Sequence, residues 1–291
     1  MPSNTILPKW IQEQLPQGTE SIWFESSLGK IHALHRGRGR QVVLMHGNPT
    51  WGYLWRKVMN ELPVDQFEVF APDLMNLGYS DDLSDENFTL NNHVTAISEF
   101  YRKNIKPGAI LVVQDWGGPI GLLAASRCPE IFSGILILNT GLGPPQKGAR
   151  KPLFHLLAHT PILGDLAFGV FGFPMRALHQ AQHDPSSIRG IVARSYRAPI
   201  TMGRRKVPMK YAKMIPFEEN HPSRPMFVEL EKFIQSLKNV EFVWGIDDPV
   251  LGRHLKNIKP LLPHAKVTEV RAGHFLQEEA FLEIAAAITR L

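Results

Sequence analysis

Four short segments of the sequence place polar side chains directly after an apolar run. Active residues of a parallel sheet collect at such positions, beyond the carboxyl ends of the strands. The segments contain Asn48, Asp115, Asp248 and His274. A carboxylate can act as a nucleophile toward carbon, and a histidine held by a second carboxylate can activate water. These residue types therefore predict hydrolysis through a covalent ester.

Asp115 is the candidate nucleophile. It lies within Val113-Gln114-Asp115-Trp116-Gly117-Gly118, between an apolar run and a helical pattern. A tight strand-to-helix turn at this place would expose one side chain, and the two glycines would let the helix approach the sheet. Val113 stands where the generic G-x-S-x-G pattern has its first glycine, so the motif is met in part. Capping of the following helix is the alternative role for this aspartate.

The other three segments offer the remaining parts of such a site. His46-Gly47-Asn48-Pro49-Thr50 can supply a backbone N–H and an amide, or it forms only a turn. Trp244-Gly245-Ile246-Asp247-Asp248-Pro249 offers the acid, for which we choose Asp248, with Asp247 as the alternative. Ala272-Gly273-His274-Phe275 places an imidazole at the start of the last predicted helix. The order nucleophile, acid and base is that of α/β-hydrolase triads.

Alternating strands and helices are predicted to position these residues. Unbroken apolar runs are typical of parallel strands that are buried on both faces. We expect a hairpin over 21–25 and 31–35, strands over 41–45, 67–71, 109–113, 135–138, 240–244 and 267–270, and helices over 53–61, 90–104, 119–127, 222–237 and 275–291. Strand–helix alternation of this kind predicts an α/β fold with a mostly parallel, doubly wound sheet.

The alternation is interrupted between residues 141 and 221. This stretch contains no clear buried strand, and a segment such as 186–197 has a helical pattern. We therefore expect a helical cap over 141–221, inserted into a discontinuous main domain of residues 1–140 and 222–291. The ligand should lie in a crevice between the cap and the edge of the sheet.

Composition limits the classes of function. The single cysteine, Cys128, excludes an internal disulfide framework and a cysteine metal cluster. No apolar run is long enough for a membrane span, and no signal peptide is evident at the N-terminus, so we expect a cytoplasmic protein without stable membrane insertion. Residues 141–220 contain twelve Lys or Arg and four Asp or Glu. A solvated face explains this charge, as would an anionic substrate, an acidic partner or an anionic membrane surface. No recognition motif for nucleic acid accompanies it.

The motifs as a group resemble those of the haloalkane dehalogenases. The resemblance includes His46–Thr50 with Tyr53–Arg56, the residues Pro72-Asp73-Leu74 with Gly78-Tyr79-Ser80, Gln114–Gly118, Trp244–Pro249 and Gly273–Phe275. It extends over nearly the whole chain and is weakest in the cap. Asn48 together with the Asp-Trp-Gly sequence separates this family from serine hydrolases and from most epoxide hydrolases.

The resemblance implies a role for each site residue. Trp116, directly after the nucleophile Asp115, would be one halide donor. The cap contains no Trp, so the second donor would be Asn48. Residues 139 and 140, Asn-Thr, offer no carboxylate, so the acid would be Asp248, a combination that resembles the third dehalogenase subfamily. Backbone N–H groups of Asn48 and Trp116 would form the oxyanion hole, and His274 would be the base. The expected partners are a small apolar halogenated substrate and halide ion, with neither cofactor nor metal.

Three alternatives remain open at this point. The same pattern occurs in β-lactone decarboxylases of long-chain olefin synthesis. An epoxide hydrolase would use two cap tyrosines as acids, for which Tyr196 and Tyr211 are the candidates. A non-catalytic ligand receptor on this fold would be expected to lack a member of the triad, and none is missing here. The sequence leaves the preferred substrate and the oligomeric state, including a homo-oligomer, undecided.

Overall fold

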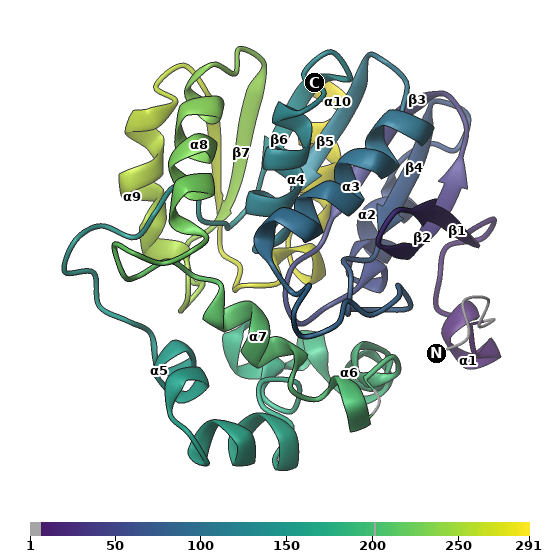
Figure 1. Cartoon of the computed structure of the whole chain (residues 1–291). Coiled ribbons are helices and arrows are strands. Elements are labelled where there is room, and N and C mark those ends of the chain that lie inside the picture. The colour runs from purple at the N-terminus through teal and green to yellow at the C-terminus, as the bar shows by residue number, and fades with distance from the viewer. Residues whose placement is uncertain (1–6, 201) are drawn as a thin grey trace.

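The computed structural model describes residues 7–200 and 202–291, and within them the chain builds one eight-stranded sheet (Figure 1). The strands lie side by side in the order β1-β2-β4-β3-β5-β6-β7-β8. Strands β1 and β2 pair antiparallel, β2 also pairs antiparallel with β4, and the remaining pairs are parallel. Their bounds are Glu20–Ser26, Gly29–Gly37, Arg40–Met45, Phe67–Pro72, Ala109–Val113, Phe132–Ile137, Val240–Gly245 and Lys266–Val270 for β1 to β8.

The strand register brings the loops that follow the strands to one edge of the sheet. Met45 at the end of β3 pairs with Val113 at the end of β5, and Val113 pairs with Ile137 at the end of β6. Gly245 at the end of β7 pairs with Val270 at the end of β8. The residues that follow these positions therefore start at the same level, which confirms the sheet predicted from the apolar runs.

Helices cover both faces of the sheet (Figure 1). One face packs against α3, α4, α8 and α9, and the opposite face packs against α2 and α10. Helix α3 shows how the sequence determines such an element. Thr89 caps its N-terminus by accepting a hydrogen bond from the Asn92 N–H, and Leu90, Val94, Ile97 and Tyr101 form its buried stripe. The bounds are Arg56–Glu61 for α2, Leu90–Asn104 for α3, Gly117–Ser126 for α4, Arg224–Gln235 for α8, Leu255–Ile258 for α9 and Phe281–Arg290 for α10; α1 covers Lys9–Gln12.

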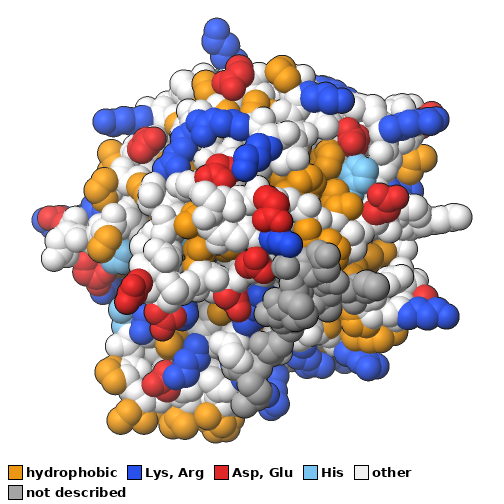
Figure 2. All heavy atoms as spheres, turned by 45° about the vertical axis from the view of Figure 1, so that its right-hand side comes forward, with side chains coloured by type: hydrophobic (Ala, Val, Ile, Leu, Met, Phe, Trp, Pro, Cys, Tyr) orange, Lys and Arg blue, Asp and Glu red, His pale blue; other side chains and the backbone are white. Residues whose placement is uncertain are grey.

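The chain between β6 and α8 forms short helices that lie below the sheet in Figure 1. Its α-helices are α5 (Leu153–His159), α6 (Gly190–Arg197) and α7 (Val207–Lys213). The turn η2 (Asp165–Val170) is π-helical, and η3 (Leu178–Ala181), η4 (Pro185–Ile188) and η5 (Met202–Arg204) are 3-10 turns. No strand occurs in the described part of this insertion. Hydrophobic side chains gather along the lower edge of the molecule, where the insertion lies (Figure 2).

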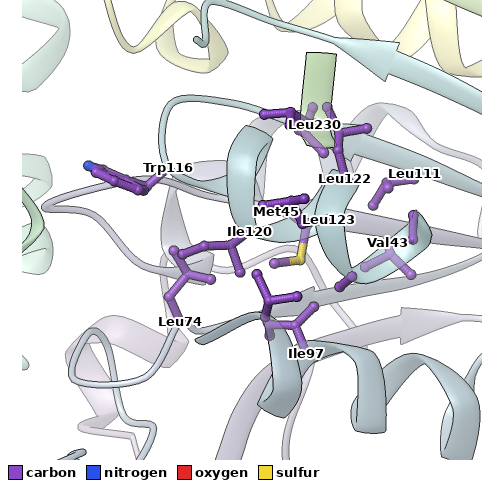
Figure 3. Close-up of a cluster of buried hydrophobic side chains, with 14 of the residues drawn as sticks. Val43, Met45, Leu74, Ile97, Leu111, Trp116, Ile120, Leu122, Leu123 and Leu230 are labelled. Atoms are coloured by element: carbon purple, nitrogen blue, oxygen red, sulfur yellow. The ribbon is translucent and has the colours of Figure 1, made fainter. Parts of the chain in front are cut away.

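A continuous apolar core joins the sheet to the helices on the α3–α4 face. Val43, Met45 and Leu111 from the strands contact side chains of α3, α4 and α8, and Ile97, Ile120 and Leu230 are among these contacts (Figure 3). All six side chains are fully buried. Burial of such side chains stabilises the fold by about 1.5–3 kcal/mol each. The packed core therefore fixes the positions of the strand ends from which the loops start.

Three helices differ from the sequence predictions. The helix predicted over 53–61 begins as a 3-10 turn, η1 (Gly52–Trp55). The helix predicted over 186–197 is interrupted, because Arg189 has extended backbone angles between η4 and α6. The last helix begins at Phe281 rather than at 275, after the 3-10 turn η8 (Leu276–Glu278). Phe275 N–H donates to the insertion instead of continuing a helix, which explains the delayed start. No helix in residues 7–200 and 202–291 is long and apolar enough to cross a membrane.

Candidate active site

Asp115 occupies a sharp turn between β5 and α4. Its backbone φ is +48°, a left-handed conformation that is uncommon for residues other than glycine. The two glycines after Asp115 lie so close to neighbouring segments that neither position has room for a side chain. A Cβ on Gly117 would lie 2.3 Å from the Met45 carbonyl oxygen, and a Cβ on Gly118 would lie 2.0 Å from Thr140 Oγ1. Helix α4 begins at Gly117 and has no side-chain cap, so the alternative role of Asp115 as a capping residue is wrong.

The carboxylate of Asp115 has two different neighbours. Its Oδ1 accepts a hydrogen bond of 2.7 Å from the backbone N–H of Asn48, in the loop after β3. Its Oδ2 lies 3.6 Å from Nε2 of His274. The side chain keeps 17% of its surface accessible. One oxygen is therefore held by a fixed donor, while the other faces the imidazole.

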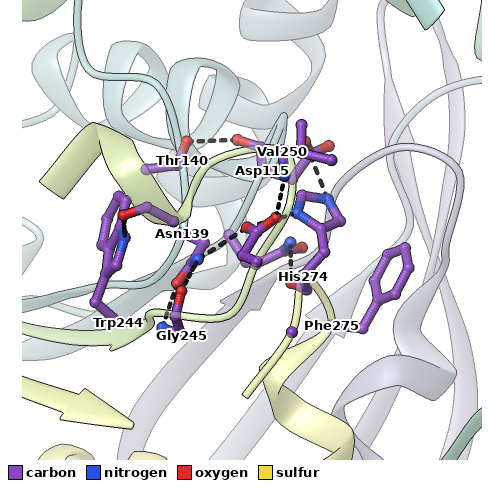
Figure 4. Close-up of polar contacts among 12 residues, drawn as sticks. Asp115, Asn139, Thr140, Trp244, Gly245, Val250, His274 and Phe275 are labelled. Carbon is purple, nitrogen blue, oxygen red and sulfur yellow. Dashed lines mark hydrogen bonds and ion pairs between the residues drawn. The ribbon is translucent and has the colours of Figure 1, made fainter. Parts of the chain in front are cut away.

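His274 lies between two carboxylates (Figure 4). Its Nδ1 is 2.9 Å from Oδ2 of Asp248, and its Nε2 faces Asp115. Burial lowers the pKa of the imidazole, but the negative charge of Asp248 and the hydrogen bonds to both carboxylates outweigh this and raise the pKa of His274 to about 10. The imidazole therefore holds its proton at neutral pH.

Asp248 is fully buried and lies in the loop after β7. Burial by itself would raise the pKa of this carboxyl group, but the charge of His274 and several hydrogen bonds hold it below its ordinary value. One of these bonds is donated to Oδ1 by the Val250 N–H, at 2.7 Å. Asp247, the alternative acid, points elsewhere and pairs with Arg271 and His183 at 2.7 and 2.9 Å. The structure thus brings Asp248, and not Asp247, to His274.

Asn139 is a site residue that sequence reasoning missed. Its position at the end of β6 appeared only as the absence of a carboxylate. In the structure its Nδ2 donates to Oδ2 of Asp248 at 2.8 Å and to the Gly245 carbonyl at 2.9 Å, and its Oδ1 accepts the Gly245 N–H at 2.7 Å (Figure 4). Asn139 therefore joins the ends of β6 and β7 and holds the carboxylate of Asp248. Its location after a central strand was the available signal.

The insertion holds the loop that carries His274. The backbone N–H of His274 donates to the Ala181 carbonyl at 2.7 Å, and Gln182 forms hydrogen bonds with both the N–H and the carbonyl of Phe275. A Cβ on Gly273 would lie 2.3 Å from the same Ala181 oxygen. These contacts join residues more than 90 positions apart, and no spacing in the sequence indicated them.

Trp116 and Asn48 are both next to Asp115. Trp116 directly follows it in the turn before α4, and Asn48 contacts it from the loop after β3. The Trp116 ring packs near Tyr211 and Phe227, and its indole nitrogen points away from the buried cluster drawn in Figure 3; it donates no hydrogen bond to any described residue. Asn48 Nδ2 donates to the Pro208 carbonyl of α7 at 3.3 Å, and its buried Oδ1 has no partner among the described residues.

The two candidate acids of an epoxide hydrolase are engaged elsewhere. The Tyr196 hydroxyl donates to Glu278 at 2.5 Å, and the Tyr211 hydroxyl donates to the Met75 carbonyl at 2.9 Å. Both side chains are fully buried. Neither hydroxyl is therefore free to donate to a substrate beside Asp115.

Comparison with known proteins relates this geometry to a family. Residues 41–281 match the family model described as alpha/beta hydrolase fold. The chain is 30% identical over 279 residues to haloalkane dehalogenase 2 of Mycobacterium bovis, with 92% of this chain and 93% of the relative covered. It is 29% identical over 265 residues to a cis-3-alkyl-4-alkyloxetan-2-one decarboxylase of Shewanella oneidensis, with 88% and 82% covered.

Among solved structures, a haloalkane dehalogenase of Agrobacterium tumefaciens has the same fold, with a TM-score of 0.82 at 21% identity over 94% of this chain and 97% of that chain. The order of the strands, the turn at Asp115 and these similarities agree with one another. The chain belongs to the α/β-hydrolase fold family and is a homologue of the haloalkane dehalogenases within it.

Proposed function

We propose that this protein hydrolyses haloalkanes to alcohol and halide through a covalent alkyl ester on Asp115. The proposal rests on the different neighbours of the two carboxylate oxygens. Oδ1 accepts a hydrogen bond from the Asn48 N–H, whereas Oδ2 faces His274. A carboxylate is a suitable nucleophile, because the ester that it forms has a carbonyl carbon that water can attack.

In the first step, Oδ2 of Asp115 attacks the carbon that carries the halogen. The new C–O bond forms as the carbon–halogen bond breaks, and halide departs with the bonding electron pair. Oδ1 remains with its N–H donor and becomes the carbonyl oxygen of the ester. Attack of this kind needs alignment more than acid–base chemistry, which the rigid turn at Asp115 supplies.

Two N–H groups are available to the departing halide. Trp116 offers an indole N–H without a partner among the described residues, directly after the nucleophile. Asn48 Nδ2 carries two hydrogens, of which one serves the Pro208 carbonyl. Donors aimed at a developing negative charge lower the barrier that produces it. In this proposal the Asn48 amide also links halide binding to helix α7 of the insertion.

In the second step, His274 takes a proton from water, and the resulting hydroxide adds to the ester carbonyl carbon. The backbone nitrogen of Asn48 lies 2.7 Å from Oδ1, where the oxyanion develops. We assign the backbone N–H of Trp116, and not its indole N–H, as the second donor to this oxygen. When the intermediate collapses, the bond from the carbonyl carbon to the alkyl oxygen breaks, and the proton held by His274 passes to that oxygen to give the alcohol. The carboxyl group of Asp115 that remains loses its proton to solvent and is again a carboxylate. Esterification removes the charge of Asp115, one of the groups that raise the pKa of His274, so the imidazole can release its proton to solvent and then act as the base.

The division of the chain into a main domain (1–140 and 222–291) and a cap (141–221) is part of this proposal. Cap residues contact the site at two places. The Ala181 carbonyl accepts a hydrogen bond from the His274 N–H, and the Pro208 carbonyl accepts one from Asn48 Nδ2. A small apolar substrate would bind between these elements. Asp115, Asp248 and His274 are all present, which argues against a non-catalytic receptor, and the occupied tyrosine hydroxyls argue against an epoxide hydrolase.

A β-lactone decarboxylase is the second candidate. The similarity to the oxetanone decarboxylase of Shewanella oneidensis is close to that found for haloalkane dehalogenase 2, at 29% against 30% identity. The same carboxylate would open a strained lactone ring, and loss of carbon dioxide would give an alkene. The two candidates share Asp115 and differ in the product.

The test measures both products from one preparation. The purified protein is incubated with several bromoalkanes and, separately, with a cis-disubstituted β-lactone, and free halide and alkene are measured. The Asp115→Asn variant is the matched blank, because it keeps the side chain's shape and removes its negative charge. Halide release above the blank supports the proposal. Alkene formation without halide release would assign the second candidate instead.

A further inference from the structure

The insertion exposes an unusual concentration of apolar side chains. Twelve large hydrophobic side chains are exposed in the described residues, and seven of them lie between Leu153 and Phe171. We call the most exposed members, Leu153, Ile162, Leu163, Val170 and Phe171, the apolar ridge. They lie on α5, on η2 and in the connection between them. Figure 2 shows hydrophobic side chains along this lower edge of the molecule.

The ridge does not belong to the core of the insertion. Phe168, Ala158, Met209 and Ala212 form that core beneath it. Ile162, at the tip, is 73% exposed and has a φ of +64°. A β-branched residue in this left-handed region is strained, and such strain is often kept where it serves a function. Contiguous exposed apolar surface of this kind marks an interaction surface.

Basic side chains border the ridge. Arg205 donates to the Gly169 carbonyl at 3.5 Å, and Lys206 lies 2.7 Å from Asp165, so both lie against η2. Lys151 precedes α5. Exposed apolar side chains surrounded by Lys and Arg are characteristic of elements that lie in the interface of an anionic lipid bilayer.

An arginine-lined cleft adjoins the ridge. It is a surface cleft of about 420 Å³, and Arg176, Arg189 and Arg197 line it together with His179. None of the three arginines forms a salt bridge with a described residue. Arg176 also lies beside Gly172, directly after Phe171 of the ridge. Three guanidinium groups around one cleft repel one another, and a phosphate group would offset this repulsion with charge-assisted hydrogen bonds.

We propose that the apolar ridge and the arginine-lined cleft form a peripheral docking surface for an anionic phospholipid membrane. The ridge would enter the headgroup region, and the cleft would hold a lipid phosphate. Helices α5 and η2 are only 7 and 6 residues long, so the surface would lie on the bilayer rather than span it. A second copy of the chain fits less well, because a two-fold contact through the ridge would bring the basic borders of both copies together.

Vesicle flotation tests this proposal and does not depend on the reaction at Asp115. The protein is mixed with vesicles of equal parts phosphatidylcholine and phosphatidylglycerol, or of phosphatidylcholine alone. We expect the protein to bind the anionic vesicles at low salt. The partition coefficient should be at least tenfold lower for the same vesicles in high salt, and also for vesicles of phosphatidylcholine alone. No binding of the wild-type protein to anionic vesicles at low salt would overturn the proposal.

Matched variants distinguish binding through the apolar ridge from nonspecific hydrophobic adsorption to the vesicles. Leu163→Ser removes a side chain that is 57% exposed on the ridge, and Leu282→Ser removes one that is 56% exposed on α10. The first change, combined with Phe171→Ser, should weaken vesicle binding at least tenfold, and the second should leave it unchanged. Equal effects of the ridge and control variants would contradict a specific surface.

The cleft has its own pair of variants, and the oligomeric state distinguishes a second copy. Arg189→Glu with Arg197→Glu should reduce binding to anionic vesicles, whereas Arg253→Glu should not, because η6 (Gly252–His254) does not line the cleft. Light scattering after gel filtration reports the oligomeric state of each variant. If the ridge variant converts an oligomer to a monomer without changing vesicle binding, a second copy covers the ridge and the lipid proposal is wrong.

Discussion

Asn139 donates a hydrogen bond of 2.8 Å to the same oxygen of Asp248 that lies 2.9 Å from His274 Nδ1. The carboxylate of Asp248 is thus held by two groups, the amide of Asn139 after β6 and the imidazole of His274 after β8. A buried carboxylate with several donors keeps one orientation and remains ionised. This pair of residues therefore fixes the direction of the histidine that faces Asp115.

Replacing Asn139 should weaken both activity and stability. Asn139→Ala removes one donor from Asp248 and leaves the Gly245 N–H and carbonyl without their side-chain partners. Loss of buried hydrogen-bond partners costs about 1–3 kcal/mol. We expect a fall in the free energy of unfolding of this size, measured with urea, and at least a tenfold lower kcat. Unchanged kcat in a destabilised variant would show that Asn139 supports only the fold.

The assignment of the acid is tested by two neighbouring aspartates. Asp248→Asn should lower the rate of ester hydrolysis by about a hundredfold or more, because the imidazole loses its charged partner and its correct tautomer. Asp247→Asn should leave the rate within a factor of about two, because Asp247 pairs with Arg271 and His183 outside the site. Single-turnover kinetics measures this step. A larger loss in the Asp247 variant would reverse the assignment.

Close packing at Asp115 predicts the effect of adding a single methyl group at position 47. A Cβ at position 47 would lie 2.3 Å from both Cβ and Oδ1 of Asp115. Gly47→Ala should therefore displace the carboxylate and reduce kcat by at least about a hundredfold, with a loss of about 1–3 kcal/mol in stability. Gly141→Ala is the matched control, because no atom lies within 4 Å of its added Cβ. Full activity of the Gly47 variant would mean that the carboxylate position is not critical.

The raised pKa of His274 predicts a stability that depends on pH. The ordinary pKa of histidine in an unfolded chain is about 6.5, whereas in the folded protein the carboxylates raise the pKa of His274 to about 10. The protonated imidazole thus contributes stability that is fully present below about pH 6.5 and is lost as the pH rises through about 10. Over this window the unfolding free energy of the wild type should fall, by about one kcal/mol per pH unit, relative to that of His274→Gln. Urea unfolding of both proteins across the window measures the difference. Parallel curves would contradict the charged imidazole.

Much of the fold follows from local sequence patterns. Each predicted strand lies within or overlaps an observed one, because a largely apolar run of four or five residues between turns has few other stable arrangements. The turn at Asp115 has a local signature in the two glycines that follow it. The position before Pro249 favours Asp248 over Asp247 in the sequence, and the structure places Asp248 at His274.

Other features depend on contacts between distant segments, and local patterns do not contain them. Asn139 reaches Asp248 only because β6 and β7 are neighbours in the sheet. Gln182 holds Phe275 across 93 positions, and this contact, which no periodicity records, delays the last helix to Phe281. The interruption at Arg189 is a local feature instead, because it lies directly before Gly190, whose φ is +52°.

The covalent ester on Asp115 is the central claim, and intact-protein mass spectrometry of His274→Ala tests it most directly. Without the base, the first step proceeds and the ester is not hydrolysed. After treatment with a bromoalkane, the variant should gain the mass of one alkyl group less one hydrogen, peptide mapping should place it on Asp115, and the variant that also carries Asp115→Asn should gain none. A wild-type protein that releases halide while His274→Ala acquires no added mass would contradict the account.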